Sequence, residues 1–142
     1  MTASTKDKSD YFGIDVPFMR HIGLEAVSLN LETCLTRLPV NAENVNSRRI
    51  VHGGVLMSAL DFTLSAAARG HAPLEFSAVT IDLTTHFLNE AKSELEIEGR
   101  CVRRGKSIAF CEGDVRDREG RVVASARGVF KLIEIARGGE GR

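Results

Sequence analysis

A single acid, Asp61, lies within a long apolar segment. Residues 52–68 read HGGVLMSALDFTLSAAA, and their alanine and leucine content predicts a helix. A helix that is apolar on nearly every side is expected to be buried. A buried carboxylate is costly unless it is paired, hydrogen-bonded or used in chemistry. Asp61 could act as a general base for water or as a nucleophile toward an acyl group. Alternatively, it could be a structural acid held by Ser58, Thr63 or Ser65.

Two glycines, Gly53 and Gly54, open this predicted helix. The first N–H groups of a helix have no intrahelical partner and lie at the positive end of its dipole. Glycine also lets a ligand approach the backbone closely. The pair could therefore bind an oxyanion that forms on an attacked carbonyl. The alternative is that the glycines allow tight packing of the helix start against a sheet.

The spacing of Gly53 and Asp61 restricts how they could work together. They are eight residues apart on one predicted helix, which is about 12 Å along its axis. A donor and a base must both lie within roughly 3 Å of the reacting atoms. The two groups of one chain therefore cannot serve one carbonyl. We expect Gly53 of one subunit to meet Asp61 of another across a two-fold axis, which gives two equivalent sites.

Three further side chains could assist this chemistry. Asn46 lies in a polar loop, residues 41–49, and could hold a substrate carbonyl or fix the loop. His52 could hydrogen-bond the substrate or the loop, and no residue at metal-ligand spacing accompanies it. Thr80 could orient a water molecule for Asp61 or be an ordinary β-branched strand residue.

A basic turn forms another candidate site. Arg103, Arg104 and Lys106 surround Gly105 between two predicted strands. These cations could bind the phosphates of a nucleotide-bearing substrate, or they could form a solvated turn. No phosphate-binding loop or dinucleotide fingerprint is present. The serines of the helix lack the G-x-S-x-G setting of a serine hydrolase.

The predicted elements place these residues on one helix and a sheet. A short helix or turn at 16–22 precedes strands at 25–31 and 33–40, and the long helix follows at 52–69. Four more strands are expected at 79–87, 95–101, 108–115 and 122–133, with turn spacing that favours antiparallel pairing. In the first of these four, alternation puts Val79 and Ile81 on one face and Thr80 and Asp82 on the other. The sheet must wrap around the one long apolar helix.

Composition excludes several classes of protein. The 142 residues suit one domain, predicted at 16–135, between flexible segments at 1–15 and 136–142. Lys plus Arg and Asp plus Glu both number 19, which argues against nucleic-acid binding and opposes self-association only weakly. The longest apolar stretch, 55–68, is too short to span a membrane, and no signal peptide is visible. Three cysteines without a C-x-x-C motif predict reduced thiols in a cytoplasmic protein, and neither a disulfide framework nor a zinc site.

These residues resemble a known family. The run Asn46-x5-His52-Gly53-Gly54-Val55-x5-Asp61 is similar to the hot-dog-fold acyl-CoA thioesterases of the phenylacetate-pathway type, known as PaaI-like. The strand at 79–83, the region of Phe87, the turn at 104–106 and the closing strand at 120–130 match as well. The resemblance covers roughly residues 20–133. It implies an α+β fold in which an antiparallel sheet of about five or six strands wraps one central helix.

The resemblance also implies a function and its residues. It implies hydrolysis of a CoA thioester without metal or cofactor, by homodimers that often pair into tetramers. The thioester carbonyl is then polarised by Gly53, and the acid acting across the dimer is Asp61. Asn46, His52 and Thr80 map to positioning roles, and Gly54 with Arg103, Arg104 and Lys106 maps to binding of CoA. One departure is Arg49, because the family often has glycine three residues before the histidine.

Two other functions fit the same fold. One is an acyl-CoA-binding module that binds the thioester without turnover; this chain shows no fused DNA-binding segment that would suit a regulator. The other is a hydratase or dehydratase, which would need a histidine and an acid arranged differently from His52 and Asp61. The acyl group depends on a pocket that loops and a partner subunit are expected to shape.

Overall fold

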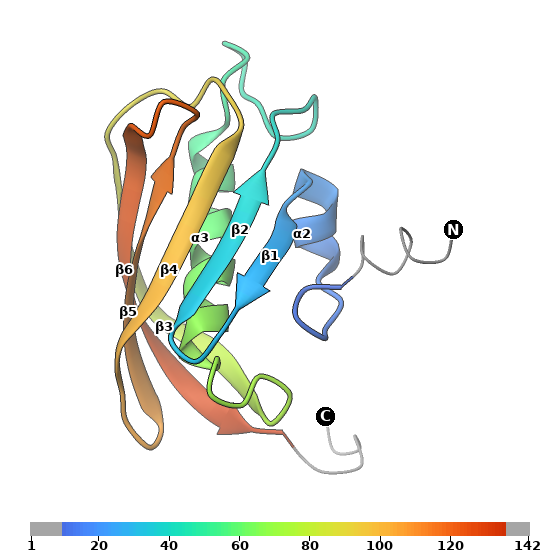
Figure 1. The fold of residues 1–142 in the computed structure, drawn as a ribbon. Coiled ribbons are helices and arrows are strands. Elements are labelled where there is room, and N and C mark those ends of the chain that lie inside the picture. Colours follow the sequence, from blue (N-terminus) through green and yellow to red (C-terminus); the bar gives the residue numbers. More distant parts are fainter. Residues whose placement is uncertain (1–9, 136–142) are drawn as a thin grey trace.

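Six strands form one antiparallel sheet that curls around a central helix in the computed structural model, which describes residues 10–135 (Figure 1). The central helix is α3 (Gly53–Ala68), and the strand order in the sheet is β1-β2-β4-β5-β6-β3. The predicted hot-dog architecture is confirmed. The strands are β1 (Glu25–Leu29), β2 (Thr33–Leu38), β3 (Phe76–Phe87), β4 (Leu95–Arg104), β5 (Ile108–Arg116) and β6 (Val122–Glu134).

The start of the described chain packs onto the helix. The predicted flexible tail, 136–142, and residues 1–9 of the predicted flexible segment 1–15 lie outside the described residues. Tyr11 is buried, its hydroxyl donates to the Leu24 carbonyl at 2.7 Å, and its ring meets the Phe62 ring edge-on. The predicted domain start at residue 16 left Tyr11 in the flexible segment, so the packing of Tyr11 on the helix was not predicted.

A short helix, α2 (Pro17–Ile22), lies beside β1 (Figure 1). Proline in the first turn costs no hydrogen bond, because N–H groups there have no intrahelical acceptor. The helix ends at Gly23, whose φ of 85° is left-handed, and the Leu24 N–H closes the turn on the Met19 carbonyl. Met19 and Ile22 are buried against the core.

Small residues let α3 lie close to the middle of the sheet. Gly99 in β4 and Gly113 in β5 are directly opposite each other. A Cβ at Gly113 would lie 2.5 Å from the Glu98 carbonyl oxygen and 2.6 Å from Cδ1 of Leu64. The helix therefore packs closely against the sheet at Gly99 and Gly113, the positions where β4 and β5 have no side chain. Leu60 and Leu64 are fully buried there.

Strand β3 occupies an edge of the sheet rather than a place beside β4. It pairs with β6, and residues 88–94 carry the chain from there to β4 on the other side of β5. The predicted antiparallel pairing is present, but β3 and β4 do not form a hairpin. One long side of β3 is consequently without a neighbouring strand in the described chain.

A bulge in β3 reverses one of the predicted faces. The register shifts between Thr80 and Asp82, where Thr80 is opposite Phe130 and Asp82 is opposite Val129. Phe130 is fully buried beneath the helix, so Thr80 shares that inner face. The prediction that Thr80 and Asp82 share a face was therefore wrong, because strict alternation cannot include an inserted residue.

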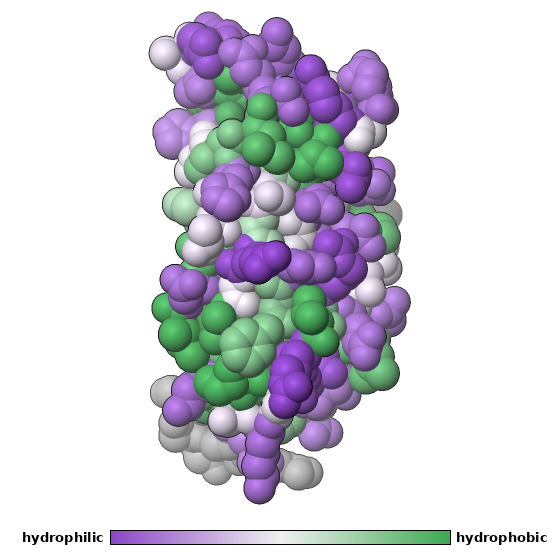
Figure 2. All heavy atoms as spheres, turned by 90° about the vertical axis from the view of Figure 1, so that its left-hand side faces the viewer, coloured by the Kyte–Doolittle hydropathy of each residue, from purple (hydrophilic) through white to green (hydrophobic). Residues whose placement is uncertain are grey.

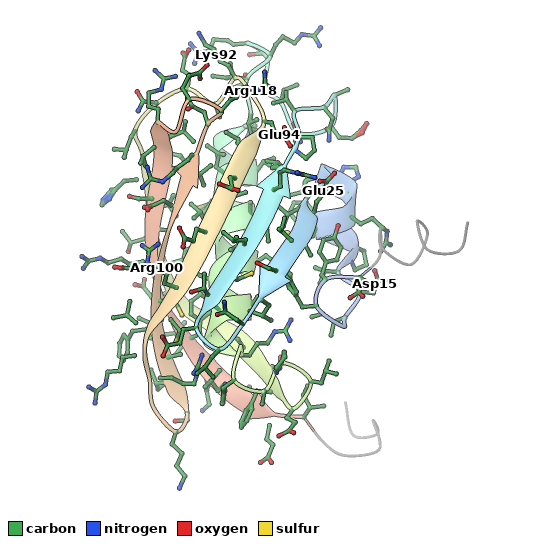
Figure 3. All side chains as sticks on the ribbon, in the orientation of Figure 1. Asp15, Glu25, Lys92, Glu94, Arg100 and Arg118 are labelled. Carbon is green, nitrogen blue, oxygen red and sulfur yellow. The ribbon has the colours of Figure 1, made fainter. Side chains whose placement is uncertain are left out.

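The outer face of the sheet is charged across its middle. Arg100 in β4 is opposite Glu112 in β5, which is opposite Arg127 in β6. Arg100, labelled in Figure 3, lies 3.5 Å from a Glu112 carboxylate oxygen. Figure 2 shows a band of hydrophilic side chains between two apolar patches on the side of the molecule that carries β5 and β6. Within residues 10–135, no helix is long and apolar enough to cross a membrane.

Candidate active site

One face of α3 stays open in the single chain. Asp61 is half-buried and Met57 is 41% exposed, although Leu60 and Leu64 on the sheet-facing side are fully buried. The expectation of a helix buried on all sides was wrong for this chain alone. Met57 is the one large apolar side chain that α3 exposes on this face, which also carries Ser58, Asp61 and Ser65.

The carboxylate of Asp61 is held by Thr80. The Thr80 hydroxyl donates to Oδ1 of Asp61 at 2.7 Å. The β3 bulge makes this contact possible, because it turns Thr80 toward the helix. No other hydrogen bond within residues 10–135 engages the Asp61 side chain, so Oδ2 is available to accept a proton.

The helix hydroxyls that could have held Asp61 bond elsewhere. Ser58 donates to the Gly54 carbonyl, and Ser65 donates to the Phe62 carbonyl. Thr63 donates to the Ala59 carbonyl and pairs with Thr36. The structural explanation of Asp61 through these three neighbours is therefore not supported. This leaves an acid on an open face with one oriented hydroxyl beside it.

The start of α3 leaves one backbone donor free. His52 is the N-cap residue, and its Nδ1 accepts the Gly54 N–H at 2.8 Å. The N–H groups of Val55 and Leu56 donate to the His52 carbonyl. Among the described residues, Gly53 N–H donates to no acceptor. The helix start therefore offers Gly53, and not Gly54, as its N–H donor for a ligand.

Gly53 lies against the end of strand β3. A Cβ placed on Gly53 would contact the Phe87 ring at 3.6 Å. Thr80 meets Asp61 farther along the same strand, so β3 runs beside the open face of α3. The contact between Phe87 and Gly53 was not predicted from the sequence. Alternation places Phe87 on the same face of β3 as Thr85, and this could have suggested that Phe87 faces the helix.

Asn46 organises the loop that enters α3. Its side-chain oxygen accepts from the N–H of Arg48 at 2.9 Å and of Ile50 at 3.4 Å. The backbone N–H of Asn46 donates to the Ile50 carbonyl at 2.8 Å. Of the two roles predicted for Asn46, the structure therefore displays the loop-fixing one. This contact positions the residues immediately before His52.

Arg49 adopts an unusual backbone conformation in this loop. Its φ is +65°, in the left-handed region that favours glycine. This conformation explains why the family that the sequence resembles often has glycine three residues before the histidine, since only glycine adopts it without steric cost. Arg49 therefore preserves the loop path at a conformational cost of about 1–2 kcal/mol.

The basic turn divides into one structural and two exposed cations. Arg104 donates to the carbonyls of Ala67, Ala68 and Leu31 at 3.0, 2.9 and 2.8 Å. It therefore closes the C-terminal end of α3, where a cation is favoured by the helix dipole. Arg103 and Lys106 are exposed. The structure does not bring these three residues together around one ligand.

A hollow on the outer face of the sheet lies apart from these groups. Its volume is about 940 Å³, and Asp82, His86, Arg100, Glu112 and Arg127 are among its lining residues. None of the predicted site residues lines it. Residues 10–135 hold no cluster of three or more histidine, cysteine or acidic side chains that could bind a metal ion. The candidate chemistry thus lies on the helix side of the sheet.

Comparison with known proteins identifies the family that this architecture represents. Residues 49–124 match the family model described as the Thioesterase superfamily. A candidate esterase from Saccharolobus solfataricus is 26% identical over 117 residues, which cover 80% of this chain and 81% of the relative. The matched region includes the entry to α3, Asp61 and Thr80.

Solved structures share the fold. A candidate esterase from Mycobacterium tuberculosis has a TM-score of 0.78 at 26% identity, over 86% of this chain and 99% of the other. A Streptococcus mutans protein solved with acetyl-CoA bound has a TM-score of 0.72 at 22% identity, over 79% of this chain and 90% of the other. At that identity the second match establishes the fold alone.

Proposed function

Because the chain belongs to the thioesterase superfamily, we propose that it hydrolyses an acyl-CoA thioester to a free acid and CoA. The observation that carries this proposal is the Asp61–Thr80 hydrogen bond on the open face of α3. An acid oriented by a hydroxyl and left with a free oxygen suits activation of water or direct attack on an acyl carbon. The acetyl-CoA bound to the Streptococcus mutans protein supports a CoA ester as the substrate class.

Gly53 supplies the other half of the proposed reaction. Its N–H has no acceptor within the described chain and lies at the positive end of α3. A thioester carbonyl oxygen placed there would gain negative charge during attack, and the N–H would stabilise it. His52 holds the helix start in place through its bond to Gly54.

The proposed site requires two subunits. Gly53 and Asp61 are eight residues apart on the regular helix α3, about 12 Å along its axis. The free edge of β3 beside α3 carries exposed apolar side chains, including Val79, Ile81 and Phe87. We place the dimer contact there, because it would bring Asp61 of one subunit to Gly53 of its partner.

The CoA moiety is assigned to the exposed cations. Arg103 and Lys106 have no carboxylate within ion-pair distance among the described residues, so they are available for CoA phosphates. Arg104 is assigned the structural role at the end of α3 instead.

The motif around Asn46 and His52 supports a phenylacetate-pathway type of enzyme, with an aromatic acyl group and a dimer-of-dimers tetramer. Three free thiols suit a reducing cytoplasm.

A hydrolysis screen with one variant and one control tests the proposal. Asp61→Asn keeps the side-chain shape and the Thr80 contact but removes the base, so turnover of aryl and aliphatic acyl-CoAs should fall by at least about 100-fold. Asp82→Asn, two residues beyond Thr80 on the outer face, should keep turnover near that of the unmodified protein. Saturable acyl-CoA binding without turnover in the unmodified protein would instead establish a binding module.

A further inference from the structure

Two cysteines face each other across neighbouring strands. Cys101 in β4 is directly opposite Cys111 in β5. Both side chains are buried on the helix side of the sheet, with exposures of 8% and 3%. Directly opposite residues in antiparallel strands have Cα atoms about 4.5–5.5 Å apart. A disulfide spans Cα separations of about 4.4–6.8 Å, so the Cα separation expected for this pair is compatible with a disulfide.

The surroundings make the two thiols unequal. Hydrogen bonding from the Cys111 thiol lowers the pKa of Cys101, burial opposes this, and the Arg104 guanidinium lowers it further. The same hydrogen bond and burial raise the pKa of Cys111. Cys101 is therefore the better nucleophile of the pair.

The third cysteine provides an internal comparison. Cys34 is fully buried in β2, opposite Gly99 rather than another cysteine. Burial raises the pKa of Cys34 to about 12. It has neither a thiol partner across the strand nor a depressed pKa, so we expect it to remain reduced when Cys101 reacts.

We propose that Cys101 and Cys111 form a peroxide-responsive dithiol that closes reversibly into a disulfide. The Cys101 thiolate attacks one oxygen of hydrogen peroxide, the O–O bond breaks, and Cys101 sulfenic acid and hydroxide form. That hydroxide takes the proton of the Cys111 thiol and leaves as water, and the resulting Cys111 thiolate attacks the Cys101 sulfur. The S–S bond forms, the S–O bond breaks, and the released hydroxide leaves as a second water with the proton that Cys101 lost when it ionised. In sum, two thiols are oxidised and one peroxide is reduced to two waters.

The disulfide would link β4 to β5 covalently, near the end of the sheet where Arg104 binds the C-terminal end of α3. The register of β4 and β5 shifts immediately after Cys101, and the Cys101 N–H donates to the Glu32 carbonyl at 2.7 Å. Arg104, three residues on, binds the last carbonyls of α3. Closure of this β4–β5 loop restricts the unfolded chain, so the oxidised protein should unfold at a higher temperature than the reduced protein.

Peptide mapping of the full-length protein tests the proposal. The reduced protein is treated with hydrogen peroxide, free thiols are blocked with N-ethylmaleimide in denaturant, and tryptic peptides are analysed by mass spectrometry. The expected product is a cross-link between peptides 101–103 and 107–116, with Cys34 blocked as a free thiol. A dithiol reductant should remove the cross-link.

Cysteine variants provide the controls. Cys34→Ala should form the same cross-link at the same peroxide concentration. Cys111→Ser should stop at Cys101 sulfenic acid, which dimedone traps, because no resolving thiol remains. The proposal is overturned if Cys101 and Cys111 of the unmodified protein stay reduced under peroxide, whether or not Cys34 oxidises. It is also overturned if both become over-oxidised without a cross-linked peptide.

Discussion

Replacing Gly53 with proline isolates the backbone donor proposed to bind the thioester oxygen. Gly53 is the first residue of α3, and its N–H donates to no acceptor in the described chain. Proline removes that N–H and is well tolerated at the first position of a helix. The preceding residue, His52, has φ −63° and ψ 138°, the extended conformation that proline requires before it. The free energy of unfolding should therefore change by no more than about 1 kcal/mol.

The effect on catalysis should be much larger than the effect on stability. Loss of one oxyanion donor lowers kcat by about 100- to 1000-fold, or about 2.7–4 kcal/mol. Gly53→Ala is the matched control, because it keeps the N–H and its Cβ meets the Phe87 ring at an ordinary 3.6 Å. Both variants are compared in steady-state acyl-CoA hydrolysis and in thermal unfolding. If Gly53→Pro folds and its kcat stays within a few-fold of that of Gly53→Ala, the assignment of the donor is wrong.

Substitutions at four further residues separate their roles. Thr80→Val removes the hydrogen bond to Asp61, so kcat should fall about tenfold with the fold retained; an unchanged kcat in hydrolysis assays would argue against a positioning role. Arg104→Ala removes three bonds to backbone carbonyls and should destabilise the protein by about 3 kcal/mol in denaturant unfolding. Arg103→Ala should leave stability within about 0.5 kcal/mol and raise the KM for acyl-CoA; equal destabilisation by both would contradict this division. Arg49→Gly relieves the left-handed strain and should stabilise the protein by about 0.5–1 kcal/mol in the same measurement, whereas Arg49→Ala should not.

The order of elements and the central helix could be predicted from the sequence. The helix was predicted at 52–69, and the structure has α3 at Gly53–Ala68 with His52 as its cap. The pattern sufficed because the glycine pair, the alanine-rich run and the following Gly70 mark the helix limits by local chemistry. Strand limits agreed within a few residues for the same reason, since turn residues separate them.

The features that build the site depend on contacts distant in sequence. The alternation of apolar and polar residues along 79–87 does not reveal whether the strand contains a bulge. It therefore could not predict that Thr80 lies beside Asp61. The apolar helix suggested burial on all sides, but its own sheet leaves the face with Met57 and Asp61 open. The use of Arg104 at the end of α3 joins residues more than thirty positions apart, which a single-sequence pattern does not encode.

The central claim is that two subunits build each site, and complementation between inactive variants tests it most directly. Asp61→Asn and Gly53→Pro chains, carrying different affinity tags, are co-expressed and the mixed dimers are purified through both tags. In a mixed dimer, the Gly53 of the first chain and the Asp61 of the second form one intact site of two. The account predicts that mixed dimers hydrolyse acyl-CoA at about half the rate of the unmodified dimer, whereas each homodimer is nearly inactive. Mixed dimers as inactive as both homodimers would contradict it.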